Sequence, residues 1–262
     1  MIVVLTYEYC ILKVEGIIFD WGFTLFYFEN PSVQKYYKCF DEGLEKALDL
    51  LIESKILKSV ELKNTFVKKF RRKSKSYFRE SIKSQIEYPT SLIFKEVLEE
   101  ILSEIEVPFE KLFQRLANLY HSCEAEEWKP YPNTKATLKT LKQKNLKLAL
   151  LSNHSNHFTV ENVLKNYGML PFFDTIITSA IVGKRKPGKE AFFYTLRELG
   201  IKKAESVMVV GDEYADVVGG KRAGLIPVLY KRKYQFPYEK EINIPNLLEI
   251  KDISEILELI EK

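Results

Sequence analysis

Short apolar runs recur along the chain, and three of them end directly before a polar residue. They are GIIF before Asp20, LALL before Ser152 and VMVVG before Asp212. Continuous apolar runs of this length are typical of parallel strands that are buried on both faces. In open α/β sheets, ligands bind just beyond the carboxyl ends of such strands. The pattern therefore makes Asp20, the first of the three, a candidate nucleophile at a strand end.

After residue 130, helical and strand patterns alternate regularly. We expect helices at 134–144, 158–167, 189–199 and 253–260, and strands that end at 151, 178, 210 and 230. Alternation of this kind predicts helices packed on both faces of one sheet. The predicted fold class is α/β, with a doubly wound, mainly parallel, Rossmann-like sheet as its core.

The segment from residue 29 to residue 130 has a different periodicity. Apolar residues recur there every three to four positions in about four groups, the first of which is Phe40, Leu44, Ala47, Leu48 and Leu51. Pro130 and Pro132 then disfavour continuation of a helix. We predict an all-helical domain at 29–130, inserted into a core domain made of residues 1–28 and 131–262.

The first 13 residues precede the first predicted core strand and are rich in strand formers. Two interpretations stay open. The stretch pairs as an edge strand or hairpin, or it is an upstream extension that the native protein does not contain.

Composition indicates an ordinary globular protein. The 262 residues are 46% hydrophobic and 29% charged, with a formal net charge of +4. Three cysteines without a spaced motif favour free thiols that pack as small core residues in a reducing compartment. No apolar stretch approaches the ~20 residues that span a bilayer, and the N-terminus lacks the features of a secretory signal. We expect a cytoplasmic protein with no membrane partner.

Basic residues cluster on one predicted helix between Lys68 and Arg79. They could steer an anionic substrate or contact nucleic acid, but the helix carries apolar residues on its opposite face and the whole-chain charge is modest. A solvated helix face, with no nucleic-acid partner, is the favoured interpretation. The three histidines, His121, His154 and His157, are too unevenly spaced to suggest a metal cluster, and a surface-loop role is favoured for the two that follow Ser152.

Four segments in chain order resemble the motifs of the haloacid dehalogenase-like (HAD) hydrolase superfamily. They are Asp20-Trp21-Gly22-Phe23-Thr24, Leu151-Ser152-Asn153, Lys186-Pro187, and Gly211-Asp212 followed by Asp216. The helical insertion after the first motif is similar to the cap domain of one class of this superfamily. Such caps close over the nucleophile and select the substrate.

The resemblance implies a role for each motif residue. Asp20 is the expected nucleophile, which forms an aspartyl-phosphate, and Lys186 neutralises negative charge beside it. Substrate phosphate is expected to bind Thr24, Ser152, Asn153 and Lys186. Mg²⁺ is the expected cofactor because hard oxygen ligands suit it, and its expected ligands are Asp20, the main-chain carbonyl of Gly22, Asp212 and Asp216.

Gly22 departs from the commonest pattern of phosphatases in this superfamily. They usually carry there a second Asp, which protonates the leaving group and activates water. General acid–base help contributes roughly 10²- to 10⁴-fold in rate, so its loss predicts a slow enzyme unless His154 or a cap side chain replaces it.

The predicted activity is Mg²⁺-dependent hydrolysis of a small phosphorylated metabolite by a monomer or homodimer. Phosphonoacetaldehyde hydrolases also follow the nucleophile with Trp and a small residue, so a C–P hydrolase stays an alternative. A weakly catalytic phosphate-binding or regulatory protein is another, because of Gly22. Haloacid dehalogenases lack the Gly-Asp pair of the fourth motif, so Gly211 and Asp212 argue against dehalogenation. The substrate cannot be identified from the sequence.

Overall fold

The computed structural model describes residues 13–102, 109–236 and 239–260 of the chain. The expected pairing of the first 13 residues lies outside this part, except for residue 13 itself, which belongs to no helix or strand.

Six parallel strands form the central sheet, in the order β5-β4-β1-β6-β7-β8. Their bounds are β1 (Gly16–Phe19), β4 (Lys147–Ser152), β5 (Thr175–Thr178), β6 (Val207–Gly211), β7 (Ile226–Tyr230) and β8 (Leu248–Ile250). Every neighbouring pair is parallel. The predicted fold class is confirmed, and β8 is an additional strand that the pattern analysis missed.

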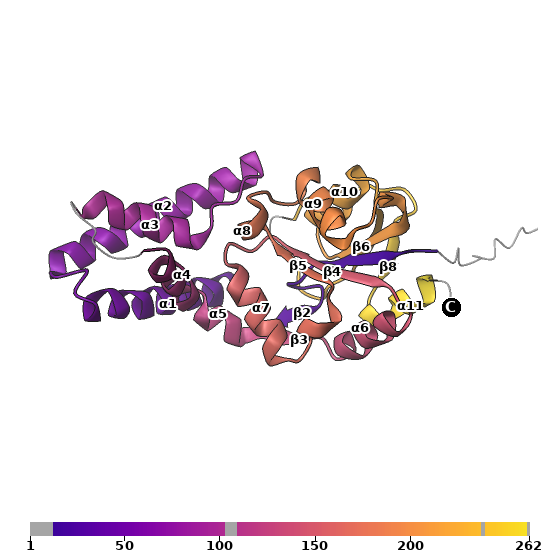
Figure 1. The fold of residues 1–262 in the computed structure, drawn as a ribbon, viewed down its shortest axis with the longest axis horizontal. Helices are drawn as coiled ribbons and strands as arrows, with labels where there is room; N and C mark the ends of the chain where they lie inside the picture. Colours follow the sequence, from indigo (N-terminus) through magenta and orange to yellow (C-terminus); the bar gives the residue numbers. More distant parts are fainter. Residues whose placement is uncertain (1–12, 103–108, 237–238, 261–262) are drawn as a thin grey trace, which may run out of the picture.

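Helices cover both faces of this sheet (Figure 1). They are α6 (Thr134–Gln143), α7 (His157–Asn166), α8 (Ser179–Val182), α9 (Lys189–Leu199), α10 (Tyr214–Arg222) and α11 (Ile256–Leu259). Side chains alternate between the faces along β1, since Ile17 and Phe19 belong to one buried cluster and Ile18 to the other. Helices α6, α7 and α11 pack on the first face, and α9 packs on the second.

A helical insert, residues 33–127, separates two short strands that precede and follow it. The antiparallel pair is β2 (Phe26–Phe28) and β3 (Trp128–Pro130). The insert contains α1 (Val33–Glu53), α2 (Val60–Ser84), α3 (Thr90–Ile101), α4 (Phe109–Tyr120) and the short α5 (Ser122–Glu127). It extends away from the sheet in Figure 1. Its function as a separate cap domain stays a prediction.

The insert has a hydrophobic cluster of its own. Leu44, Leu48 and Leu51 of α1 meet the rings of Phe70 and Phe94, which lie 4.5 Å apart. The basic residues on α2 pair partly with acids of the same insert, including Lys69 with Glu100, Arg71 with Asp41, and Lys73 with Glu96 and Glu100.

The segment that joins the second and third helices of the insert also contacts the core domain. The Glu87 amide donates to Gly183 O at 3.0 Å, and the Thr90 amide donates to Ser155 O at 3.0 Å. The buried Glu87 carboxylate accepts hydrogen bonds from Arg185 and Ser179. The segment between α2 and α3 is therefore joined to the loop that precedes Lys186.

A disulfide joins Cys39 of α1 to Cys123 of α5, with Cα atoms 5.0 Å apart. The expectation of free thiols was wrong for these two residues. They are 84 positions apart in sequence, and only the packing of α1 against α5 brings them within the distance that a disulfide spans. Cys10 lies outside the described residues.

Candidate active site

The candidate site lies at the carboxyl edge of the sheet, where β1 runs between β4 and β6. Phe19, the last residue of β1, pairs with Leu150 on one side and Val210 on the other. The residues just beyond these pairs therefore leave the sheet at the same edge, and the Asp20 amide donates to Val210 O at 2.9 Å. The register places Asp20 between the ends of β4 and β6.

Lys186 connects the site residues that come from distant segments. Its ammonium donates to Asp20 Oδ1 at 2.6 Å, to Asp216 Oδ1 at 2.5 Å and to Leu151 O at 2.7 Å. The side chain is buried, with 2% of its surface exposed. Burial alone would lower the pKa of Lys186, but the charges of Asp20 and Asp216 outweigh it and raise that pKa above the ordinary value. The ammonium is therefore a fixed positive charge beside Asp20.

Asn153 positions the main chain of Lys186. Its side-chain amide donates to Lys186 O at 2.9 Å and accepts from Lys186 N at 2.8 Å. The motif resemblance implied phosphate binding for Asn153. These two bonds indicate a structural role as well, which is to hold the main chain at Lys186. The neighbouring Ser152 ends β4 and is buried at the same edge.

Asp212 is held by two side chains that come from other elements. The Thr24 hydroxyl donates to Asp212 Oδ1 at 2.7 Å. Arg232 pairs with Asp212 Oδ2 and also with Glu239. Arg232 was not among the predicted site residues. It is the second residue after the apolar strand β7, whereas Asp20 follows β1 directly, so its signal in the sequence is weaker.

Carboxylates outnumber cations at the buried centre of the site. Burial, together with the charges of Asp20 and Glu213, raises the pKa of Asp216 despite its contact with Lys186. Desolvation of its carboxyl group and the Asp20 charge also raise the pKa of Glu213, an exposed residue that was not among the predicted site residues. A site of this kind favours additional positive charge.

Three carboxylates are close enough to share one cation. Asp20, Asp212 and Asp216 offer oxygen atoms that all lie within 4.8 Å of one another. This hard-oxygen donor set fits Mg²⁺. Gly211 makes the close approach possible, because a Cβ there would overlap the side chain of Asp216.

Trp128 fills the space beside Gly22. A Cβ added at Gly22 would lie 2.9 Å from Trp128 Cη2, closer than real Cβ contacts. The indole is buried among aromatic rings, with its centroid 4.6 Å from that of Trp21 and 5.2 Å from that of Phe23. The backbone at Gly22 does not have a positive φ, so space rather than backbone conformation restricts this position.

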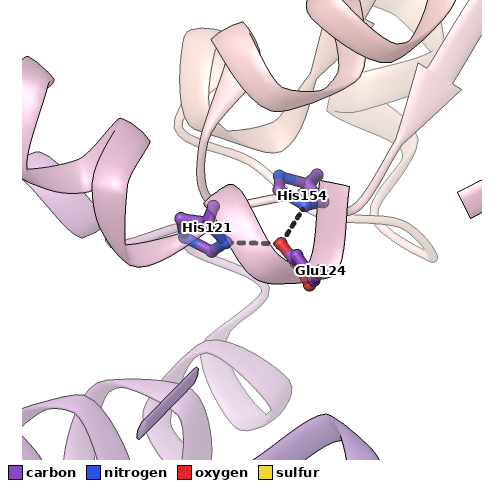
Figure 2. Close-up of side chains that lie close together, drawn as sticks. All are labelled: His121, Glu124 and His154. Carbon is purple, nitrogen blue, oxygen red and sulfur yellow. Dashed lines mark hydrogen bonds and ion pairs between the residues drawn. The ribbon is translucent and has the colours of Figure 1, made fainter. Parts of the chain in front are cut away.

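Two of the three histidines meet beside this site, contrary to the sequence analysis. The rings of His121 and His154 lie 5.1 Å apart, and both contact the buried Glu124 (Figure 2). His154 also contacts the Trp21 ring at 5.5 Å, so it is not a surface-loop residue. The prediction failed because His121 comes from the end of α4 and His154 from the loop after β4. The fold brings these segments together. His157 contacts Thr178 and Glu161 instead.

The fold is a doubly wound parallel sheet, and a carboxylate–ammonium–carboxylate group lies at its carboxyl edge. These two features together are typical of one class of α/β hydrolases. The family model of haloacid dehalogenase-like hydrolases matches residues 14–224. The chain belongs to this family, and it is an enzyme of the hydrolase class.

Curated relatives share parts of the chain. Glyceraldehyde 3-phosphate phosphatase of Methanocaldococcus jannaschii is 29% identical over 205 residues, which cover 70% of this chain and 89% of the relative. Phosphoglycolate phosphatase of Aquifex aeolicus is 38% identical over 96 residues, 37% of this chain and 44% of the relative.

Solved structures share the fold. A 2-haloacid dehalogenase from Pseudomonas syringae pv. Tomato DC3000 matches with a TM-score of 0.61 and 18% identity, covering 94% of this chain and 97% of the other. A HAD phosphatase from Thermococcus onnurineus matches with a TM-score of 0.54 and 22% identity over the same shares. Within the described residues, no helix has the length and apolarity needed to cross a bilayer.

Proposed function

We propose that the protein is a Mg²⁺-dependent phosphatase of a small phosphorylated metabolite and that Asp20 is its nucleophile. The observation that carries this proposal is the buried Lys186 ammonium, which joins Asp20 to Asp216 at 2.6 Å and 2.5 Å. An ammonium fixed on the nucleophile suits a reaction in which two anions must meet. The relatives named as phosphatases support phosphoryl transfer as that reaction.

The proposed reaction has two displacements. A carboxylate oxygen of Asp20 attacks phosphorus, and the bond from phosphorus to the substrate oxygen breaks as that oxygen leaves with the electron pair. A water oxygen then attacks the same phosphorus, the bond to Asp20 breaks, and inorganic phosphate is released with the carboxylate restored. The leaving oxygen takes up one proton and the water gives one up, so the cycle is balanced.

The other motif residues hold the reacting groups. Ser152, Thr24 and Lys186 bind phosphate oxygens, and Asn153 contributes by fixing Lys186. Asp20, Gly22 through its carbonyl, Asp212 and Asp216 would hold Mg²⁺. The bound ion supplies positive charge that offsets the repulsion between carboxylate and phosphate.

The helical insert is proposed to select the substrate as a cap over Asp20, in a monomer or homodimer. A cytoplasmic location stays part of the proposal. The disulfide between Cys39 and Cys123 is compatible with it, since intracellular proteins of hyperthermophiles contain disulfides, and abundant Lys and Glu with few Gln fit such a source.

A phosphate-binding protein without turnover is the second candidate, and Trp128 is the observation that favours it. The Trp128 ring occupies the space beside Gly22 that the side chain of an Asp at this position would need. A C–P hydrolase would need a lysine of the insert that forms a Schiff base with the substrate. In the described part of the insert, neither the sequence nor the structure distinguishes one lysine for this role.

One experiment separates these candidates. The purified protein is incubated with Mg²⁺ and p-nitrophenyl phosphate, then with a panel of sugar, nucleotide and short carboxylic-acid phosphates, and released phosphate is measured. Phosphate release that stops with a chelator and returns with Mg²⁺ supports the phosphatase. Binding of phosphate without release from any substrate supports the binding protein, and chelator-resistant turnover contradicts Mg²⁺ dependence.

A further inference from the structure

His121, Glu124 and His154 form a second cluster of potential ligands, outside the carboxylate site. One oxygen of Glu124 lies 2.5 Å from His121 Nδ1 and 3.0 Å from His154 Nε2. Figure 2 shows both rings directed at this oxygen. The ligand atoms of the three residues all lie within 4.8 Å of one another. Two of the residues come from the α4–α5 junction of the helical insert, and the third comes from the loop after β4.

In each histidine, the ring nitrogen that does not face Glu124 also has a hydrogen-bonding partner. His121 Nε2 lies 2.7 Å from the Thr90 hydroxyl, and His154 Nδ1 lies 2.8 Å from Asn156 O. Histidines that bind metals almost always have such a partner, which orients the ring and fixes its tautomer. His154 Nδ1 also accepts a hydrogen bond from the Asn156 amide at 3.1 Å, so Asn156 holds the ring with Nε2 directed at the Glu124 oxygen. A cation bound between Nε2 and this oxygen would replace the hydrogen bond that now joins them.

Charge balance favours the same conclusion. Glu124 is buried, with 3% of its surface exposed, and its ion-pair partners within the described residues are the two histidines alone. A divalent ion bound here would place a full positive charge directly beside this buried carboxylate.

We propose that His121, Glu124 and His154 bind a divalent transition-metal ion of the Zn²⁺ class. Two imidazoles and one carboxylate suit this class and not Mg²⁺, which takes oxygen ligands. Zinc binds such ligands at about 2.0–2.2 Å, so ligand atoms now 2.5 and 3.0 Å apart would separate by roughly half an ångström. The ion would join α5 of the insert to the loop that begins at Ser152. The proposal does not depend on the phosphatase activity.

Cobalt spectroscopy tests the site. The full-length protein is freed of metals with a chelator, saturated with Mg²⁺ to fill the carboxylate site, and titrated with Co²⁺. We expect one equivalent of Co²⁺ to give the intense visible absorption of a four- or five-coordinate nitrogen-ligated ion, and one equivalent of Zn²⁺ to remove it. An octahedral all-oxygen spectrum, or no binding, would overturn the proposal.

Variants identify the ligands. His154→Ala and Glu124→Gln should each lose the cobalt spectrum, whereas His157→Asn should keep it, because His157 contacts Thr178 and Glu161. Thr90→Val removes the hydroxyl that contacts His121 and Ser155 but leaves all three proposed ligands in place, and it should weaken binding roughly 10- to 100-fold. A spectrum that persists in His154→Ala would overturn the assignment. Should the ligand variants fail to fold, X-ray absorption of the zinc-loaded wild type still decides, since imidazole scattering supports the site and an all-oxygen shell contradicts it.

Discussion

At the scale of single residues, the site depends on one buried lysine among several carboxylates. Lys186 contacts Asp20 and Asp216 directly, while Asp212 has a counter-charge of its own in Arg232. Removal of one partner from a buried ion pair leaves the other charge uncompensated, which typically costs about 3–5 kcal/mol. Substitutions that preserve shape are therefore the informative ones here.

Asp20→Asn should abolish phosphate release while the protein stays folded. The amide is nearly isosteric but cannot attack phosphorus, and Lys186 keeps its bond to Asp216. The expected loss is on the order of 10⁴-fold or more, as for other nucleophiles that act within a group. Phosphate release and the thermal unfolding midpoint are measured together. Turnover at the wild-type rate in this variant would exclude the covalent mechanism.

Gly22→Asp alone should destabilise the protein, by roughly 1–3 kcal/mol, because its Cβ would lie 2.9 Å from the buried Trp128 ring. Trp128→Leu provides room for the added side chain. In the double variant, hydrolysis of alkyl phosphates should rise relative to aryl phosphates by up to about 10²- to 10⁴-fold, because the new carboxyl group can protonate the leaving group.

The Trp128→Leu single variant is the matched control for this comparison, and the free energy of unfolding is measured for all three proteins. A wild-type enzyme that hydrolyses alkyl and aryl phosphates equally fast would mean that another group, such as His154, already transfers the proton.

At the scale of elements, the sequence predicted what depends on local periodicity. Strands β1, β4 and β6 are continuous apolar runs, so their pattern alone places the polar residues that follow them at one edge of the sheet. The short strands β2, β3 and β8 have three residues each. This is too few for an alternating or continuous apolar pattern to be detected in the sequence. Contacts between the insert and the core, such as Glu87 with Arg185, depend on the three-dimensional packing of segments that no local pattern relates.

Arg232→Gln should bind divalent metal more tightly at the carboxylate site. The guanidinium now holds Asp212 Oδ2 and repels a cation there. A hydrogen bond to a charged group is worth about 1.5–3 kcal/mol, so we expect the dissociation constant for Mn²⁺ to fall by roughly 10-fold or more. Electron paramagnetic resonance counts free Mn²⁺ directly.

Lys231→Gln is the control for Arg232→Gln, because the exposed Lys231 pairs with Glu249. Equal or weaker binding by Arg232→Gln would show that Arg232 stays on Asp212 when the metal is bound.

Glu87→Ala should loosen the contact between the insert and the core. The substitution leaves the Arg185 guanidinium, which is 15% exposed, without its carboxylate. We expect the free energy of unfolding to fall by about 3 kcal/mol, as measured by denaturant titration. Glu80→Ala on the exposed face of α2 should change it by less than about 0.5 kcal/mol. Equal effects of the two substitutions would exclude a role for this contact.

At the scale of the whole molecule, the insert is tied to the rest of the chain at several separated points. They are the β2–β3 pair, the Glu87–Arg185 contact and the histidine cluster around Glu124. The disulfide between Cys39 and Cys123 adds a covalent link within the insert, because it joins helix α1 to helix α5. The sequence could not reveal this pairing, because three cysteines without a motif do not specify partners.

Loss of this disulfide should lower the stability of the protein substantially. A cross-link between residues 84 positions apart restricts the unfolded chain by roughly 4–5 kcal/mol in the chain-entropy model. Reductant should therefore lower the denaturation midpoint of the wild type, and the Cys39→Ser/Cys123→Ser variant should unfold at the lower midpoint whether or not reductant is present. Peptide mapping without reductant should recover one linked peptide that contains both cysteines. A wild-type midpoint that ignores reductant, with no linked peptide, would show that the two thiols stay free.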